Sequence, residues 1–179
     1  MRHYALAAIG RDRPGIVAEV TGVLLDHGAN VEDSQMTILR GHFAMTLIVA
    51  VPGEGDVERL RRELESAAER LELEAIALRE VEELDPAAPE PSHMVTVYGV
   101  DHPGIVHAAA QALADRGVDI TDLNTQLVEE EGEESLYALM MEVALPGEVS
   151  PDELDRALRE VGARQGVEVS LRELERDAL

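Results

Sequence analysis

Residues 10–17 read Gly10-Arg11-Asp12-Arg13-Pro14-Gly15-Ile16-Val17, and residues 99–106 repeat the pattern as Gly99-Val100-Asp101-His102-Pro103-Gly104-Ile105-Val106. Further matches follow in the same order: Leu24 with Leu113, Gly28 with Gly117, Asn30 with Asp119, Val31 with Ile120, Asp33 with Asp122, and Leu78-Arg79-Glu80 with Leu171-Arg172-Glu173. The offset is 89 residues at first and 94 at Pro52-Gly53-Glu54 and Pro146-Gly147-Glu148. So many matches in the same order, at an offset that changes by only a few residues, indicate a duplicated folding unit.

Apolar spacing around the repeated loop predicts the elements of each unit. In the first copy we expect strands at 4–9, 31–39, 43–51 and 73–81 and helices at 14–27 and 57–71; in the second, strands at 94–98, 119–128, 135–145 and 167–174 and helices at 105–115 and 151–161. Pro14 is expected to open its helix and Gly28 to end it, with a hairpin turn at Arg40-Gly41-His42. The order βαββαβ, twice, predicts an α+β protein of two ferredoxin-like units, each a four-stranded antiparallel sheet with both helices on one face.

A proline-rich segment separates the copies. Residues 83–92 contain Pro86, Pro89 and Pro91 among acidic residues, a composition typical of an extended linker. We therefore expect domains at 1–82 and 93–179.

Composition excludes several classes of function. The 179 residues include no cysteine, so there is no disulfide, thiolate nucleophile or cysteine zinc site. All 15 basic residues are arginine, which excludes a lysine Schiff base and the lysine of a phosphate-binding loop. The net charge of −22 repels nucleic acid and anionic membranes. With no apolar run near the roughly 20 residues of a membrane span, we expect a cytoplasmic protein without direct nucleic-acid or membrane contact.

The repeated loop is the most plausible place for chemistry. A helix that opens at Pro14-Gly15 leaves backbone amides unpaired at the positive end of its dipole, which suits a carboxylate or phosphate. Asn30 could read the ammonium and carboxylate of an amino acid, and Asp119 suits an ammonium. The predicted ligand-binding residues are Asp12, Arg13, Pro14, Gly15, Ile16, Val17 and Asn30, with Asp101, His102, Pro103, Gly104, Ile105, Val106 and Asp119. The alternative is that both aspartates cap helices and Asn30 completes a turn.

These residues resemble a known family. Asp12 to Val17, followed by Gly28-Ala29-Asn30-Val31, is similar to the signature of ACT domains, which are small-molecule sensing modules with the βαββαβ fold. Val31-Glu32-Asp33-Ser34, the Gly41 turn and two units in under 200 residues are similar to glycine cleavage system transcriptional repressors. The resemblance implies an amino-acid-binding regulator with ligand at the helix-start loop and at an interface between ACT units, acting through a partner transcription factor. The second copy departs from the first because His102 replaces Arg13 and Asp119 replaces Asn30.

Other readings are weaker. His102 and His107 are five residues apart, which does not align them on one helical face, so we expect no metal site. The acidic residues 129–134 lack the spacing of a calcium loop and are predicted to be a hairpin tip. No nucleophile–base pair repeats between the copies, so we expect neither an enzyme nor a cofactor.

The sequence thus predicts a tandem ACT regulator that binds a small amino acid, glycine or serine first. Exposed sheet edges tend to be paired, which favours side-by-side joining of units or a homodimer. Two alternatives stay open: an accessory ACT pair that adjusts a metabolic enzyme allosterically, and a dimerisation module without a ligand.

Overall fold

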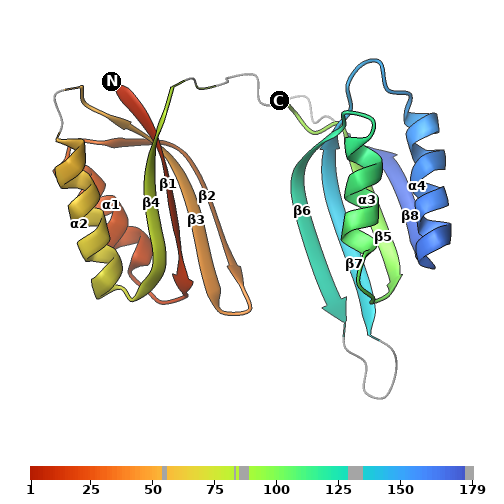
Figure 1. Cartoon of the computed structure of the whole chain (residues 1–179), viewed down its shortest axis with the longest axis horizontal. Helices are drawn as coiled ribbons and strands as arrows, with labels where there is room; N and C mark the ends of the chain where they lie inside the picture. Colours follow the sequence, from red (N-terminus) through yellow and green to blue (C-terminus); the bar gives the residue numbers. More distant parts are fainter. Residues whose placement is uncertain (54–55, 83, 85–88, 129–134, 176–179) are drawn as a thin grey trace. The chain divides into compact units, whose positions relative to one another are not determined.

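The computed structural model describes residues 1–53, 56–82, 84, 89–128 and 135–175. The chain divides into two compact units, Met1–Asp85 and Pro86–Leu179, and each contains one four-stranded sheet (Figure 1). The expected tip at 129–134 lies outside the described residues, as do residues 83 and 85–88 of the expected linker.

Both units have the element order βαββαβ, which confirms the predicted fold. The first consists of β1 (Arg2–Arg11), α1 (Ile16–Asp26), β2 (Asn30–Leu39), β3 (His42–Val51), α2 (Val57–Arg70) and β4 (Leu73–Val81). The second consists of β5 (His93–Val100), α3 (Ile105–Ala114), β6 (Asp119–Val128), β7 (Leu136–Ala144), α4 (Pro151–Gln165) and β8 (Glu168–Glu173).

The sheets are antiparallel throughout, with strand orders β2-β3-β1-β4 and β6-β7-β5-β8. Their edges are therefore β2 and β4 in one unit and β6 and β8 in the other. All ten residues of β2 are exposed. A register shift near the start of β2, between Val31 and Asp33, recurs in β6 between Ile120 and Asp122.

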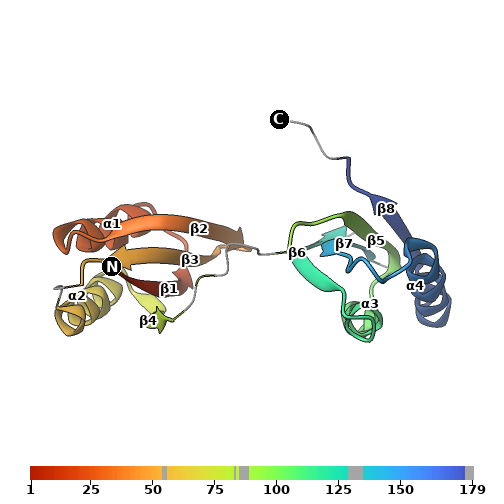
Figure 2. The same ribbon diagram turned by 90° about the horizontal axis from the view of Figure 1, so that it is seen from above.

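Each unit has its own hydrophobic core between the sheet and its two helices, which lie on one side of the strands (Figure 2). In the first unit, alternate side chains of β1 and β3 point to the helices, as period-two strand geometry requires. The stripe of α2 contributes Leu60 and Leu64, both fully buried. The second unit buries Leu154 and Leu158 of α4 in the same way.

The turns match their sequences. Arg40 (φ 49°) and Gly41 (φ 84°) form a two-residue hairpin between β2 and β3, where positive φ at both positions suits the strand twist. Gly28 (φ 65°) ends α1, and the amide of Ala29 donates to the carbonyl of Leu24 over 2.9 Å. Gly117 ends α3 with the same geometry.

Two expectations about helix ends were wrong. Pro14 does not open α1, because Gly15 lies at φ 99° and forms the N-cap, so the helix starts two residues later than expected, at Ile16. Helix α4 continues four residues past the predicted end at 161 and stops at the left-handed Gly166. No helix in the described part of the chain combines the length and the apolar character that crossing a membrane requires.

Candidate functional site

The repeated loop connects the first strand of each unit to the first helix. The amide of Asp12, just after β1, donates to the carbonyl of Gly41 in the neighbouring hairpin over 2.9 Å. The amide of Asp101 makes the equivalent bond to Ser135 at the same length. Each loop is therefore fixed at its strand end by the strand pair beside it.

Both helices begin at a glycine with a left-handed backbone. Gly15 has φ 99° and Gly104 has φ 107°, a region that side chains with a Cβ rarely adopt. Among the residues that the structure describes, no side-chain hydrogen bond caps either helix, so neither Asp12 nor Asp101 acts as a cap. The first-turn amides, which have no partner within a helix, thus meet no side-chain oxygen at the positive end of the dipole.

The residue after each aspartate ties its loop to the end of the second helix. In the first unit, Arg13 Nη2 donates to Glu72 Oε2 over 2.6 Å. This hydrogen bond is the main cause that lowers the pKa of the Glu72 carboxyl. In the second unit, His102 Nε2 donates to the carbonyl of Gln165 over 2.7 Å. Glu72 and Gln165 were missed by sequence reasoning, because only the folded unit brings the two ends together.

Within each loop, side chains and backbone have different surroundings. Ile16 and Ile105 are 2% and 3% exposed and belong to the two cores, so only their backbone can meet a ligand. Pro14, Gly15, Pro103 and Gly104 are exposed, Val17 is exposed, and Val106 is half-buried. Asp12 and Asp101 are exposed as well, so the accessible part of the predicted site combines backbone with these two carboxylates.

Asn30 and Asp119 lie far from the loop of their own unit. Asn30 pairs with Ala50 at one end of β3, whereas the loop leaves β1 beside His42 at the other end. Counting along β3 from His42 to Ala50 at about 3.3 Å per residue separates the two by roughly 26 Å. Asp119 pairs with Ala144, at the equivalent far end of β7. The structure therefore does not bring either residue to the loop within one unit.

Histidine and carboxylate side chains do not gather into a metal centre in the part of the chain that the structure describes. His102 is held by backbone carbonyls, and His107 is exposed on α3.

Both units match a known protein family. The family described as ACT domain matches residues 5–77 and 93–172, one match in each unit. A UPF0237 protein of Methanopyrus kandleri is 44% identical over 82 residues, which are 45% of this chain and 90% of the relative. One of Methanocaldococcus jannaschii is 37% identical over 81 residues, with the same shares.

Two solved structures are similar over the full length. A protein of unknown function from Galdieria sulphuraria has 30% sequence identity and a TM-score of 0.81, covering 97% of this chain and 99% of that one. A protein described as a candidate glycine cleavage system transcriptional repressor has 19% identity and a TM-score of 0.71, covering 97% and 98%. The second likeness shows the fold alone.

Proposed function

The chain belongs to the ACT-domain family, and on that premise we propose that it is a regulatory protein that binds a small amino acid, with glycine and serine as the first ligands to test. The observation that carries the proposal is the repeated helix start. Two separate loops present amides without a side-chain cap behind a left-handed glycine. Such a terminus binds a carboxylate.

The ammonium group needs a second partner, and Asn30 and Asp119 are the predicted ones. Because each lies at the far end of its own sheet, a ligand that touches both the loop and one of these residues needs two ACT units. We infer that the second unit comes from another copy of the chain, so that the ligand bridges a homodimer. A ligand held in this way stabilises the dimer by its differential affinity for the paired state.

The response would be passed to a protein partner. The charge of −22 disfavours direct contact with DNA. The full-length fold is shared with a candidate glycine cleavage system repressor. A transcription factor is therefore the partner proposed, with repression of glycine cleavage genes as the output.

Calorimetry with a panel of amino acids tests the ligand. Glycine or serine should release or absorb heat with the wild-type chain, and Gly15→Val combined with Gly104→Val should weaken the binding. Gly22→Ala is the matched control, because Gly22 lies inside α1 with open space around it. Circular dichroism checks that each variant folds. Heat from none of the amino acids would overturn the sensing role.

A pull-down with the ligand present tests the partner. Recovery of a transcription factor supports the proposed output. Recovery of a metabolic enzyme instead would contradict it and favour the accessory role.

A further inference from the structure

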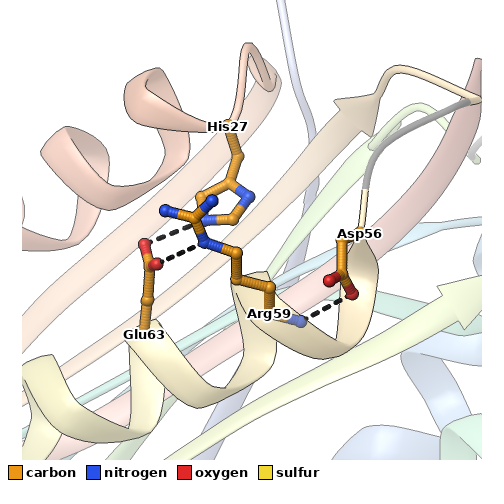
Figure 3. Close-up of polar contacts among 4 residues, drawn as sticks. All are labelled: His27, Asp56, Arg59 and Glu63. Carbon is orange, nitrogen blue, oxygen red and sulfur yellow. Dashed lines mark hydrogen bonds and ion pairs between the residues drawn. The ribbon is translucent and has the colours of Figure 1, made fainter.

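The two helices of the first unit are joined by two carboxylates. Glu19 of α1 accepts hydrogen bonds from Arg70 of α2, from Nε over 3.1 Å and also from Nη2. Glu63 of α2 accepts from His27, the C-cap of α1, over 2.9 Å and from Arg59 over 2.8 Å (Figure 3). Each helix thus gives one carboxylate to a basic side chain of the other.

The hydrogen bond from Arg59, followed by that from His27, lowers the pKa of the Glu63 carboxyl. This carboxylate therefore stays ionised at neutral pH and serves as an internal anion between the helices.

In the second unit both bridging carboxylates are replaced by alanine. The repeat offset of 89 residues places Ala108 at the position of Glu19. The offset of 94 residues places Ala157 at the position of Glu63. The buried leucines of the helices fix this second alignment, since Leu60 and Leu64 correspond to Leu154 and Leu158.

Each bridge keeps the basic partner that comes from the opposite helix, whereas Arg59, the partner of Glu63 within α2, is replaced by Glu153. Arg164 stands where Arg70 stands, and Arg116 stands where His27 stands. Neither arginine forms an ion pair with any residue that the structure describes. Arg116 Nη1 donates to the carbonyl of Ala112 over 2.9 Å. The second unit therefore has an arginine at the place of each basic partner across the helix pair, without the two carboxylates.

A groove of about 490 Å³ lies between α3 and α4 at this place. It is lined by Ala108, Ala157, Arg116 and Arg164, together with His107 and Gln111. Its volume is within the range of small-molecule sites. Two arginines in one groove are notable in a chain whose overall charge is −22.

Two carboxylates also line the groove. Asp115 accepts a hydrogen bond from the Gln111 side-chain amide over 2.7 Å. Glu160 occupies the position that Ser66 has in the first unit. Neither Asp115 nor Glu160 pairs with an arginine in the described structure, so they do not substitute for the missing bridges.

We propose that this groove binds a small dicarboxylate anion, whose two carboxylates take the places of the Glu19 and Glu63 side chains. Arg116 and Arg164 donate to one carboxylate each, and arginine is well suited to this role because its planar fork matches a carboxylate. The groove lies between helices of one unit, so the proposal is independent of the amino-acid site at the helix starts.

Calorimetry of the full chain with succinate at low salt tests the proposal. We expect one succinate per chain, with affinity that falls as salt screens the arginines. Arg164→Gln and Arg116→Gln should each weaken binding by at least about tenfold, the loss of one charge-assisted hydrogen bond. Arg70→Gln is the matched control in the first unit and should leave succinate binding unchanged. Amide NMR shifts should map to α3 and α4.

Restoring the internal carboxylates gives a second test. The double variant Ala108→Glu with Ala157→Glu should lose succinate binding while its thermal midpoint rises, because the chain then supplies its own anions. No binding by the wild type up to roughly 10 mM succinate, a range that detects millimolar affinity, would overturn the proposal, as would undiminished binding by the double variant. A parallel glycine titration reports on the helix-start loops, so failure of one proposal is distinguished from failure of the other.

Discussion

His102 Nε2 donates a hydrogen bond to the carbonyl oxygen of Gln165 over 2.7 Å, at the place where the first unit uses an ion pair between Arg13 and Glu72. The two copies therefore close the same loop with different chemistry. An arginine stays charged throughout the physiological range, whereas a histidine titrates within it.

Stability of the second unit should depend on pH through His102. Hydrogen bonds to the carbonyls of Pro103 and then Gln165 raise the pKa of its imidazole above the ordinary 6.5. Both ring nitrogens donate only when the ring is protonated. The stabilisation is therefore complete below pH 6.5 and is lost as pH rises through the raised pKa. Thermal unfolding measured between about pH 5 and pH 8 checks this, with His102→Gln removing the dependence. If the thermal midpoint changed equally with pH in the wild type and the variant, a group other than His102 would be responsible.

Replacing Gly15 should destabilise the first unit through its backbone alone. A Cβ there would meet no atom within 4 Å, but φ 99° is unfavourable for any residue with a side chain. We expect Gly15→Ala to cost about 1–2 kcal/mol. Gly22→Ala, in the interior of α1 with equally open surroundings, should instead stabilise by about 0.5–1 kcal/mol. Urea unfolding of both variants measures the difference, and effects of the same sign would contradict the argument.

Gly162 in α4 should resist enlargement for the opposite reason. A Cβ would lie 2.7 Å from the Val167 carbonyl oxygen and from Val169 Cγ2. The oxygen is a backbone atom that cannot rotate away, so Gly162→Ala should lower the free energy of unfolding by about 1–3 kcal/mol. This loss exceeds the gain from the higher helix propensity of alanine. Ala68 occupies the matching position in the first unit, so that unit accommodates a Cβ at this place. Chemical denaturation checks this, and a more stable variant would refute it.

Removing the carboxylates of the first unit should create a second anion site. The triple variant Glu19→Ala, Glu63→Ala and His27→Arg, together with the native Arg70, reproduces the two alanines and two arginines of the second-unit groove at the first-unit helices. We expect succinate stoichiometry to rise from one to two per chain in calorimetry. A stoichiometry that stays at one would show that the groove depends on more than these four positions.

Much of the fold could be predicted from the sequence because its signals are local. The hairpin at Arg40-Gly41 and the helix stop at Gly28 each follow from residues that tolerate positive φ. The duplicated loop at 10–17 and 99–106 then fixed the number of units and the order of elements. The error at Pro14 arose because proline fits two positions at a helix start: the first helical residue and the residue before the N-cap. Here Pro14 takes the second position, before the N-cap Gly15. The extra turn of α4 was missed because Arg164 and Gln165 are not apolar and gave no periodic signal.

The candidate site was less predictable because it depends on which end of the sheet each predicted residue occupies in the folded unit. Asn30 follows α1 closely in the sequence, yet the helix returns the chain to the opposite end of the strands before β2 begins. The groove of the second unit did carry a sequence signal, since Glu19 and Glu63 align with alanines. That signal gains meaning only when α1 and α2 are known to face each other.

The separate cores of the two units have an evolutionary consequence. Because the core residues of one half do not overlap those of the other, a mutation that loosens one half leaves the other able to keep its shape. The two copies can therefore differ at their helices, one with interhelical ion pairs and the other with alanines at the carboxylate positions. Divergence of this kind lets a lineage try out a new chemical preference without losing the old one.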